Sequence, residues 1–474
     1  MRLSELFSDA SADADVTGIT ADSRAVQPGY VFAALPGARA DGRGYIASAI
    51  DRGAVAVLSL PGTEAGVPVV EADEPRLALA HAAAKLSPGQ PAHVAGITGT
   101  NGKTSVARFA AQLWGALGHK AGSLGTLGAL APGYEYALRH TTPDPVEIHQ
   151  VLSQMAGHGV SHLAMEVSSH GLAQHRADAV RFAQAAFTNI TQDHLDYHAD
   201  FADYLTTKLR LTTQLLPEGA TAVVNVDGPG SDEVVRRTRE AGRRVVRVGR
   251  GGDELVLTAL RPTPAGLSVS VRHAGGEAAL RLPLIGAFQA DNALVAAGLV
   301  IEAGAEAGPT LALLQSISAA PGRMEHAATK TMPGGEAAIY VDYAHTPDAI
   351  ATALRAARPH AEGRLHVVLG AGGDRDAGKR PLMGRAAHEG ADVVIVTDDN
   401  PRTEAPGPIR DAVASGAPDA RVIPDRAEAI AAATAALAPG DVLLIAGKGH
   451  EKYQIVGDMT YPFDDVAVAR ESAA

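Results

Sequence analysis

Short apolar runs alternate with polar, turn-rich loops along most of the chain, and this pattern predicts an α/β protein. Between about residues 92 and 321 the runs are separated by helix-like stretches, which is typical of βα units with a parallel sheet. These apolar runs lie at 162–165, 185–187, 222–226 and 245–248. From 254 to 285 apolar residues recur at every second position, which predicts an antiparallel ribbon added to that sheet.

The segments on either side show the same kind of alternation. Before about residue 91 we expect strands at 30–34, 54–58 and 67–70 and a helix at 75–86. After about residue 325 we expect strands at 339–341, 365–369, 393–396 and 442–445, each followed by a polar loop. Because ligands of open α/β sheets bind beyond the carboxyl ends of the strands, these four loops predict a site. Breaks near Pro91 and at 321–323 predict three domains, 1–91, 92–323 and 324–474.

One glycine-rich turn, at residues 96–105, has the features of a phosphate cradle. It follows an apolar run that begins at His93, and it precedes a predicted helix at 106–117. Glycines let backbone N–H groups converge on phosphate oxygens, Lys103 can reach the β- and γ-phosphates, and the Thr104 hydroxyl can hold Mg²⁺. The usual pattern has glycine five residues before Gly102, where this chain has Ile97, so the cradle is of a variant kind.

Composition narrows the class of protein. The chain has 474 residues, of which 46% are hydrophobic, so it is long enough for several substantial cores. Its net charge of −12 argues against a nucleic-acid groove, and the absence of cysteine excludes disulfides and thiolate metal sites. No apolar run approaches the roughly 20 residues of a membrane-spanning helix, and residues 1–5 do not begin like a signal peptide. We therefore expect a cytoplasmic enzyme that binds neither membrane nor nucleic acid.

Two polar segments, 165–171 and 188–198, follow strands that a parallel sheet would place beside the phosphate loop. A carboxylate and an imidazole there could complete an oxygen and nitrogen shell for Mg²⁺, and Glu166 and His194 are the candidates. Taken alone, His194 would be interpreted as a structural histidine, but the density of imidazoles and carboxylates within 189–198 favours the metal site. Lys208, on the next predicted helix, would on chemistry alone be a surface lysine.

Seven motifs occur in register along the chain and together carry a family resemblance. They are Thr-Gly-Thr-Asn-Gly-Lys-Thr (98–104), Met-Glu-Val-Ser-Ser-His-Gly-Leu (165–172), Asp-His-Leu-Asp-Tyr-His (193–198), Asp-Tyr-Ala-His-Thr-Pro-Asp (342–348), Gly-Gly-Asp-Arg-Asp (372–376), Asp-Asn-Pro-Arg (399–402) and Gly-Lys-Gly-His-Glu (447–451). On these residues the chain strongly resembles the Mur ligases of peptidoglycan synthesis, and among them the tripeptide synthetases. The resemblance covers nearly the whole chain.

The resemblance implies a reaction and an architecture. It implies ATP-dependent joining of a diamino acid to the D-Glu of UDP-MurNAc-L-Ala-D-Glu through an acyl phosphate, with Mg²⁺, in a monomeric enzyme. The N-terminal domain would then bind the UDP substrate, the central P-loop domain ATP, and a Rossmann-like C-terminal domain the amino acid.

The resemblance also implies a role for individual residues. Lys103, Glu166, His194 and a carbamylated Lys208 would be catalytic, and the last three would hold metal together with Thr104. Residues that would bind ATP are Gly99, Thr100, Asn101, Gly102, Lys103, Thr104, Ser105, Asn292, Arg323, Asp342 and His345. Residues that would bind the UDP substrate are Ser23, Ala38, Arg39, Ala40, Thr141, Thr142, Ser168, Gln174 and Arg176. Residues that would bind the diamino acid are Arg380, Asp399, Asn400, Pro401, Arg402, Gly447 and Glu451.

Arg402 bears on which diamino acid is added. A guanidinium matches the distal carboxylate of meso-diaminopimelate, whereas lysine or ornithine would bring a cation towards a cation. Diaminopimelate is therefore favoured, but lysine or ornithine stay open, because Asp398, Asp399 or Glu404 could neutralise Arg402.

Two other functions fit part of the pattern. A folylpolyglutamate synthetase would share the fold, but it lacks a uridine-nucleotide domain of the kind expected at residues 22–43. A nucleotide-gated binding protein would hydrolyse ATP without forming a bond.

Overall fold

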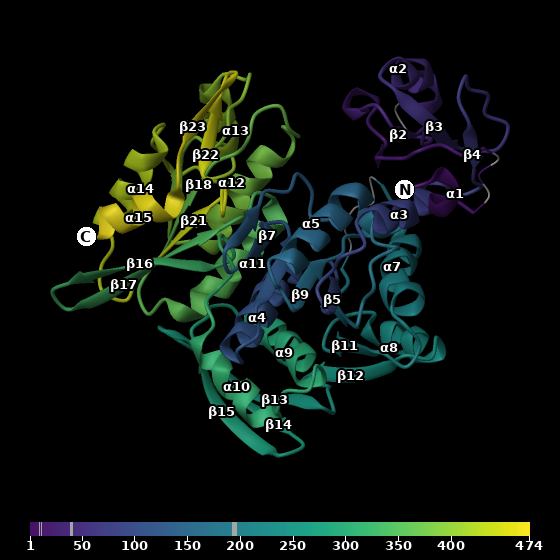
Figure 1. Ribbon diagram of the computed structural model, residues 1–474. Helices are drawn as coiled ribbons and strands as arrows, with labels where there is room; N and C mark the ends of the chain where they lie inside the picture. The colour runs from purple at the N-terminus through teal and green to yellow at the C-terminus, as the bar shows by residue number, and fades with distance from the viewer. Residues whose placement is uncertain (9, 11, 38–40, 192–196) are drawn as a thin grey trace. The chain divides into compact units, whose positions relative to one another are not determined.

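The computed structural model describes residues 1–8, 10, 12–37, 41–191 and 197–474 (Figure 1). Four of the candidate site residues, Ala38, Arg39, Ala40 and His194, lie outside the described residues. The chain divides into two compact units, Met1–Arg247 and Val248–Ala474, which we call the first and the second unit.

The first unit begins with a small parallel sheet in the order β1-β2-β3-β4. Its strands are β1 (Gly18–Thr20), β2 (Tyr30–Ala33), β3 (Ala54–Ser59) and β4 (Val69–Glu71). The accompanying helices are α1 (Leu3–Leu6), the 3₁₀ turns η1 (Ser23–Ala25) and η2 (Gly42–Tyr45), α2 (Ile46–Asp51) and α3 (Pro75–Leu86). Helix α3 starts at Pro75, because proline at the first helical position gives up no intrahelical hydrogen bond.

The rest of the first unit is built on a larger, mainly parallel sheet with the order β11-β10-β5-β9-β6-β7-β8. The strands from β11 to β6 pair in parallel, and β7 and β8 add an antiparallel edge. The strands are β5 (His93–Thr98), β6 (Ala121–Gly125), β7 (Gly128–Ala131), β8 (Tyr134–Tyr136), β9 (His162–Glu166), β10 (Gln184–Phe187) and β11 (Thr221–Asn225). The helices are α4 (Lys103–Ala116), α5 (Pro145–Gly157), α6 (Ser169–Ala173), α7 (Phe201–Arg210), the π-helical turn η3 (Leu211–Leu215) and α8 (Ser231–Glu240). Strand β5 thus lies inside the sheet, and its carboxyl end leads directly into α4.

Helix α4 follows the predicted pattern of burial. Phe109, Leu113 and Trp114 are fully buried at helical spacing, so the apolar stripe of this helix faces the core. The helix begins three residues earlier than the sequence predicts, at Lys103, because the last glycine of the turn, Gly102, serves as its N-cap.

Strand β12 (Arg244–Gly249) crosses the division between the units, and the second unit opens with an antiparallel ribbon. The ribbon consists of β13 (Leu255–Thr263), β14 (Gly266–His273) and β15 (Gly276–Leu282), as the period-two pattern predicts. The apolar helix α9 (Ala287–Glu302) contacts β13 and β14, and α10 (Ala307–Leu313) and η4 (Leu314–Ser316) follow it.

A six-stranded sheet in the order β16-β17-β21-β18-β19-β20 forms the remainder of the second unit. All its pairs are parallel except β16 with β17. The strands are β16 (Glu325–Met332), β17 (Gly335–Asp342), β18 (Leu365–Leu369), β19 (Val393–Val396), β20 (Arg421–Val422) and β21 (Val442–Ala446), and a separate hairpin joins β22 (Tyr453–Val456) to β23 (Met459–Pro462). The helices are α11 (Pro347–Ala357), η5 (Arg358–His360), α12 (Lys379–Gly390), α13 (Pro406–Ala414), α14 (Arg426–Ala435) and α15 (Asp465–Ala473). The four predicted strands are adjacent and parallel, so their loops do leave one sheet edge.

The α/β class and the parallel-rich central sheet are confirmed. The sequence did not predict β1, β6, β7, β8, β16, β20 or the β22–β23 hairpin. The boundaries of the three predicted domains stay a prediction. In the described part of the chain, no helix has both the length and the hydropathy needed to cross a bilayer.

Candidate functional site

The glycine turn between β5 and α4 depends on backbone conformations that only glycine adopts easily. Gly99 has a φ of 142° and Gly102 a φ of 87°. A Cβ on Gly99 would lie 1.9 Å from the Thr188 hydroxyl, so any side chain there would displace the end of β10. The turn is therefore packed closely against the next strand.

Thr188 and Asn189, at the end of β10, hold the turn in place. The Thr188 hydroxyl donates to the Asn101 carbonyl at 2.6 Å, and the Asn189 carbonyl accepts from Thr100 N at 2.9 Å. The Asn189 amide oxygen also accepts from Asn101 N at 3.0 Å. Both residues belong to the polar segment noted in the sequence but were not proposed as site residues. The parallel register, which pairs Phe187 with Thr98, is what places them beside the turn.

Two lysine ammonium groups lie at this turn. Lys103 Nζ donates to the carbonyls of Gly99 and Thr100, both at 2.9 Å. Lys208 Nζ donates to the same Gly99 carbonyl at 2.8 Å and lies 4.6 Å from the centre of the Tyr204 ring. The loop that would receive phosphates is therefore electropositive from both sides.

The reading of Lys208 as a surface lysine is wrong. Its side chain is only 1% exposed, since α7 packs against the sheet with Tyr204, Leu205 and Leu209 on the same buried side. Carbamylation requires the neutral amine, and carbamylation of Lys208 stays a prediction.

Glu166 and Thr104 meet at the end of β9. The buried Glu166 carboxylate accepts from the Thr104 hydroxyl at 3.0 Å and from Thr126 N at 2.9 Å. A Cβ on Gly125 would lie 2.1 Å from Glu166 Oε1, so this glycine makes room for the carboxylate.

This donor set fits a hard cation. A hydroxyl and a carboxylate oxygen at one point are the ligands that Mg²⁺ takes beside a nucleotide, where water and phosphate oxygens supply the other positions. Within the described ranges no group of three or more histidine or acidic side chains forms a metal cage, and His194 is not described. Of the candidate metal ligands, Thr104 and Glu166 are therefore two that the described part of the chain brings together.

A pocket of about 190 Å³ lies between the small sheet and the larger sheet of the first unit. Gln174 and Arg176, both candidate residues, line it together with Arg76 and His140. Arg176 donates to the Thr142 carbonyl at 2.7 Å and to the Gln174 side chain at 2.7 Å.

The other described candidates for the UDP substrate lie beside this pocket or away from it. The Thr142 hydroxyl accepts from Ser168 N at 2.9 Å and donates to the Glu166 carbonyl, which ties the pocket to the end of β9. Thr141 pairs with Thr126 at 3.0 Å. Ser23, in η1, is not among the described residues that line the pocket.

In the second unit the remaining ATP candidates form one chain of contacts. Asn292 donates to the Gln289 side chain at 3.1 Å, and Gln289 donates to the Arg323 carbonyl at 3.3 Å. The Arg323 guanidinium lies 4.7 Å from the centre of the Tyr343 ring. His345 Nδ1 lies 2.8 Å from the Tyr343 carbonyl.

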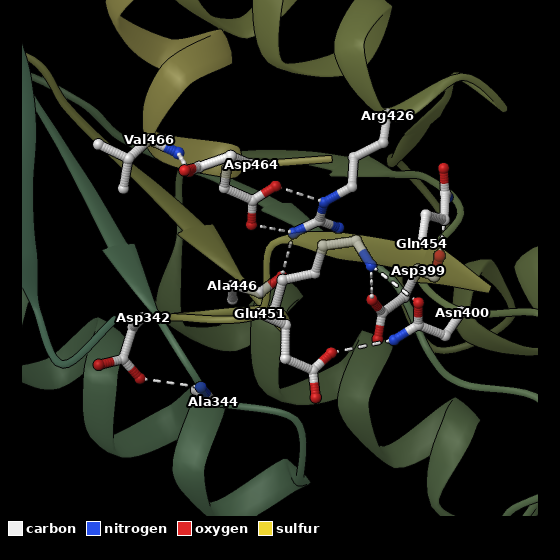
Figure 2. Close-up of polar contacts among 12 residues, drawn as sticks. Asp342, Ala344, Asp399, Asn400, Arg426, Ala446, Glu451, Gln454, Asp464 and Val466 are labelled. Carbon is white, nitrogen blue, oxygen red and sulfur yellow. Dashed lines mark hydrogen bonds and ion pairs between the residues drawn. The ribbon is translucent and has the colours of Figure 1, made fainter. Parts of the chain in front are cut away.

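Asp342 ends β17 at the same place. Its two carboxylate oxygens accept from Met324 N at 2.8 Å and Ala344 N at 2.9 Å, the second of which Figure 2 shows. Burial raises the pKa of Asp342, which the charge of Arg323 and these two hydrogen bonds oppose. Desolvation by neighbouring atoms lowers the pKa of His345, although the residue as a whole is exposed.

The loops after β19 and β21 meet as the sequence predicts. Asn400 Nδ2 donates to Glu451 Oε2 at 3.1 Å, and the Asp399 carbonyl accepts from the Gln454 amide at 2.7 Å (Figure 2). Burial, and next the charge of Asp399, raise the pKa of Glu451. The carboxylate of Glu451 is the kind of group that suits an ammonium of a ligand.

The two candidate arginines have different partners. Arg380 forms an ion pair with Glu404 at 2.8 Å. Arg402 donates to the carbonyls of Gly373, at 2.9 Å, and Asn400, at 3.5 Å. It is a non-glycine residue with a φ of 52°, and it is kept there by hydrogen bonds with the β22–β23 hairpin, from Arg402 N to the Ile455 carbonyl and from Gly457 N to the Arg402 carbonyl.

The proposed neutralisation of Arg402 is not what the structure shows. Glu404 pairs with Arg380, Asp398 with Arg410 at 2.6 Å, and Asp399 with Lys448 at 3.1 Å. Among the described residues none of these carboxylates forms an ion pair with Arg402.

Sequence reasoning missed the buried charges behind this site. Lys448 is fully buried between Asp399 and Asn400, although it lies inside a motif that was singled out. Arg426 pairs with Asp465 at 2.7 Å, both fully buried, and donates to the Ala446 carbonyl, the residue before Gly447. The position of Lys448 between two glycines, directly after a buried strand, was the sequence feature that could have predicted its burial. No such feature marks Arg426.

Comparison with known proteins accounts for these features together. Family models for the Mur ligase family catalytic domain, middle domain and glutamate ligase domain match residues 15–87, 97–300 and 322–449. The chain is 49% identical, over 98% of its length and 97% of the relative, to a protein of Caulobacter vibrioides named UDP-N-acetylmuramoyl-L-alanyl-D-glutamate–2,6-diaminopimelate ligase. It is 48% identical to a protein of the same name from Mesorhizobium japonicum, over 98% of this chain and 97% of that one.

Solved structures agree. A structure described as UDP-N-acetylmuramoyl-L-alanyl-D-glutamate–2,6-diaminopimelate ligase superposes with a TM-score of 0.73 and 30% identity, covering 100% of this chain and 98% of that chain. A folylpolyglutamate synthase of Mycobacterium tuberculosis shares the fold at a TM-score of 0.62 and 21% identity, but covers only 78% of this chain and 92% of that chain. With family models matching in succession along most of its length and relatives near half identity over nearly all of it, the chain belongs to the Mur ligase family.

Proposed function

We propose that this protein is an ATP-dependent ligase that joins an amine of meso-2,6-diaminopimelate to the D-Glu carboxylate of UDP-N-acetylmuramoyl-L-Ala-D-Glu, in peptidoglycan synthesis. Relatives that share nearly its whole length carry the name of this reaction. ATP as the energy source agrees with solved proteins of the same fold that are described as complexes with ADP.

The chemistry explains why such a site needs cations. A carboxylate is a poor electrophile, because its oxygen is a poor leaving group. Transfer of the γ-phosphoryl group of ATP gives an acyl phosphate, which the amine attacks through a tetrahedral intermediate with release of phosphate. Since carboxylate and ATP are both anionic, bringing them together requires compensation by positive charge.

We assign that compensation to residues of the first unit. The backbone N–H groups of residues 99–105 and the N-terminus of α4 would hold the phosphates, and Lys103 would exchange its two carbonyl partners for phosphate oxygens. Thr104, Glu166, His194 and carbamylated Lys208 would hold Mg²⁺, which when bound offsets the charge of the phosphates. In the second unit Asn292, Arg323, Asp342 and His345 would contact the rest of the nucleotide.

The UDP-sugar dipeptide would occupy the pocket lined by Gln174 and Arg176, with Thr141, Thr142 and Ser168 beside it. The assignments of Ser23, Ala38, Arg39 and Ala40 to this substrate also remain proposals. The four-stranded sheet before residue 87 favours this substrate over a folate, because the folylpolyglutamate synthase covers a smaller part of the chain.

The observation that carries the choice of amino acid is the set of partners around Arg402. Its guanidinium faces backbone carbonyls, while the three nearby carboxylates pair with Arg380, Arg410 and Lys448. A cation whose hydrogen bonds go to backbone carbonyls, and not to a carboxylate, can attract an anionic group of the ligand. Asp399, Asn400 and Glu451 would bind the ammonium and carboxylate at the other end of the amino acid, with Pro401 and Gly447 shaping the loops. We also infer that the enzyme is monomeric and cytoplasmic.

A direct experiment separates the candidate functions. The purified protein is given ATP, Mg²⁺ and the UDP-sugar dipeptide with meso-diaminopimelate, L-lysine or L-ornithine in parallel, and phosphate release and product mass are measured. We expect phosphate release and a product heavier by one diaminopimelate residue with the first amino acid only. Release with lysine or ornithine would overturn the choice of amino acid, and release without any new product would favour the binding ATPase.

A further inference from the structure

We propose that Lys448 is a positioning residue that fixes which way the Asn400 side-chain amide points, and so aims the N–H groups of that amide at Glu451 and the amino acid. The proposal deepens the proposed function and rests on it, since it concerns the binding of the amino acid. It follows from hydrogen bonds, burial and the order of elements around one side chain.

The oxygen of the Asn400 amide has two donors. It accepts from Lys448 Nζ at 2.9 Å and from the backbone N–H of Ile455 at 3.0 Å. An ammonium and a backbone N–H can only donate, so the oxygen of the amide has to face them. The NH₂ group is then forced to the opposite side, where it donates to Glu451 Oε2 at 3.1 Å. Figure 2 shows Asn400 and Glu451 joined in this way.

A flipped amide would lose these interactions all at once. Its NH₂ group would face two donors, and its oxygen would face the carboxylate of Glu451, so three hydrogen bonds would be replaced by three repulsive contacts. Asn400 is 3% exposed, so water is poorly able to replace the missing partners. Lys448 therefore helps to hold the Asn400 side-chain amide in one of its two possible orientations, with the oxygen towards Lys448 and the NH₂ group towards Glu451.

Lys448 is buried among polar partners, which indicates that its ammonium has a role in organising the loops around it. Its side chain is fully buried, with Asp399 Oδ1 at 3.1 Å and the Tyr453 carbonyl at 2.9 Å as its other partners. Burial lowers the pKa of Lys448, and the charge of Asp399 acts against that shift. An ammonium with two hydrogen-bond acceptors and one ion-pair partner loses less on leaving water than an unpaired one. Each of these partners belongs to a loop of the proposed amino-acid site or to β22.

Lys448 links loops that follow different strands of the sheet. Asp399 and Asn400 follow β19, Lys448 and Glu451 follow β21, and Tyr453 and Ile455 lie in β22. β18 separates β19 from β21 in the sheet. One ammonium thus joins two loops that come from non-adjacent strands, and it sets the spacing between the groups that would bind the two ends of the amino acid.

The test compares Lys448→Met with Lys330→Met as the matched control. Lys330 also donates to two backbone carbonyls, those of Thr434 and Ala435, but lies outside the site. We expect Lys448→Met to raise KM for diaminopimelate about tenfold or more, as loss of a charged hydrogen bond predicts, with KM for ATP unchanged. Lys448→Arg, which keeps a cationic donor, should recover part of that loss, and Lys330→Met should leave both constants at the parent values.

A pH profile separates positioning from mere packing. Besides burial, Asp399 raises the pKa of Glu451, whereas the Asn400 amide, Lys448 and Arg402 lower it. Tyr343 and Tyr453 also interact with Glu451, which raises the pKa of both phenols. Without the Lys448 charge the pKa of Glu451 rises further, so the acidic limb of kcat/KM for diaminopimelate should move to higher pH. An unchanged limb and KM in folded Lys448→Met would overturn the proposal, as would an equal loss for all three substrates.

Asn400→Asp keeps the test decisive if Lys448→Met does not fold. An aspartate still accepts from Lys448 and Ile455, but it has no NH₂ group to donate to Glu451. We expect a rise in KM for diaminopimelate similar to that of Lys448→Met, and a parent-like KM would overturn the proposal. Failure of the parent protein to use diaminopimelate would refute the proposed function instead, so the two failures are distinguishable.

Discussion

Lys208 Nζ donates to the Gly99 carbonyl at 2.8 Å although 109 residues separate them, which joins α7 to the phosphate loop. We expect Lys208→Ala to lose most activity, because the variant lacks both this contact and the group that can be carbamylated. A small carboxylate such as acetate should restore part of the activity by replacing the carbamate. Phosphate release with and without acetate is the measurement, and full activity in the variant would refute the modification.

Lys103→Ala should abolish turnover while the protein stays folded. The ammonium at the phosphate loop is expected to stabilise charge that develops during phosphoryl transfer, and removal of one such group costs on the order of 10²–10³ in kcat. Product formation and the melting temperature are measured together. A folded variant with undiminished kcat would remove the assigned role.

Arg402→Ala should reduce selectivity for a diacid amine. We expect kcat/KM for diaminopimelate to fall by about 10- to 100-fold, as for loss of a charged hydrogen bond, while KM for ATP changes little. The exposed Arg421 offers a control of the same charge, and Arg421→Ala should retain the parent preference. If Arg402→Ala keeps the ratio of diaminopimelate to lysine use, the choice of amino acid must be discarded.

The buried pair of Arg426 and Asp465 should dominate the stability of the last sheet. Arg426→Met leaves a carboxylate without its cation at a fully buried place, which costs about 3–5 kcal/mol in the free energy of unfolding. Replacing both residues, as in Arg426→Met with Asp465→Leu, should recover a large part of that loss. Urea unfolding measures both, and the exposed Arg236→Met serves as a control with a much smaller effect.

Acid should destabilise the protein partly through His149. Burial lowers the pKa of this histidine from 6.5 to about 4, so the folded state resists protonation that the unfolded chain accepts. The stability linked to it is fully present above pH 6.5 and is lost as the pH falls from 6.5 towards 4, by about 2 kcal/mol at pH 5. Urea unfolding at pH 7.5 and 5 should show a smaller decrease for His149→Gln than for the parent. An equal decrease in both proteins would contradict the assignment.

Most helices and strands could be predicted from the sequence, because the spacing of apolar residues reflects the geometry of a single helix or strand. The strand before the glycine turn, the buried face of α4 and the period-two ribbon each follow from spacing that a helix or strand imposes on its own residues. The short edge strands β1 and β20 were not predicted, because they bury few side chains and so have no periodic run of apolar residues.

Only the site residues that follow strands or lie in recognisable motifs could be predicted from the sequence. Asp399, Asn400 and Glu451 were expected together because their strands are parallel, and they do meet. Which cation Glu404 pairs with, and how deeply Lys208 is buried, depend on contacts between segments distant in sequence, and no local pattern encodes these.

The place of β21 between β17 and β18 has a consequence for biosynthesis. The strand that completes the middle of this sheet is the last of its strands to leave the ribosome, so its neighbours on either side wait with unpaired edges until residue 446 has been made. A nascent chain that stops before that point can already contain the whole glycine turn, yet it lacks Gly447 and Glu451, which we propose to bind the amino acid.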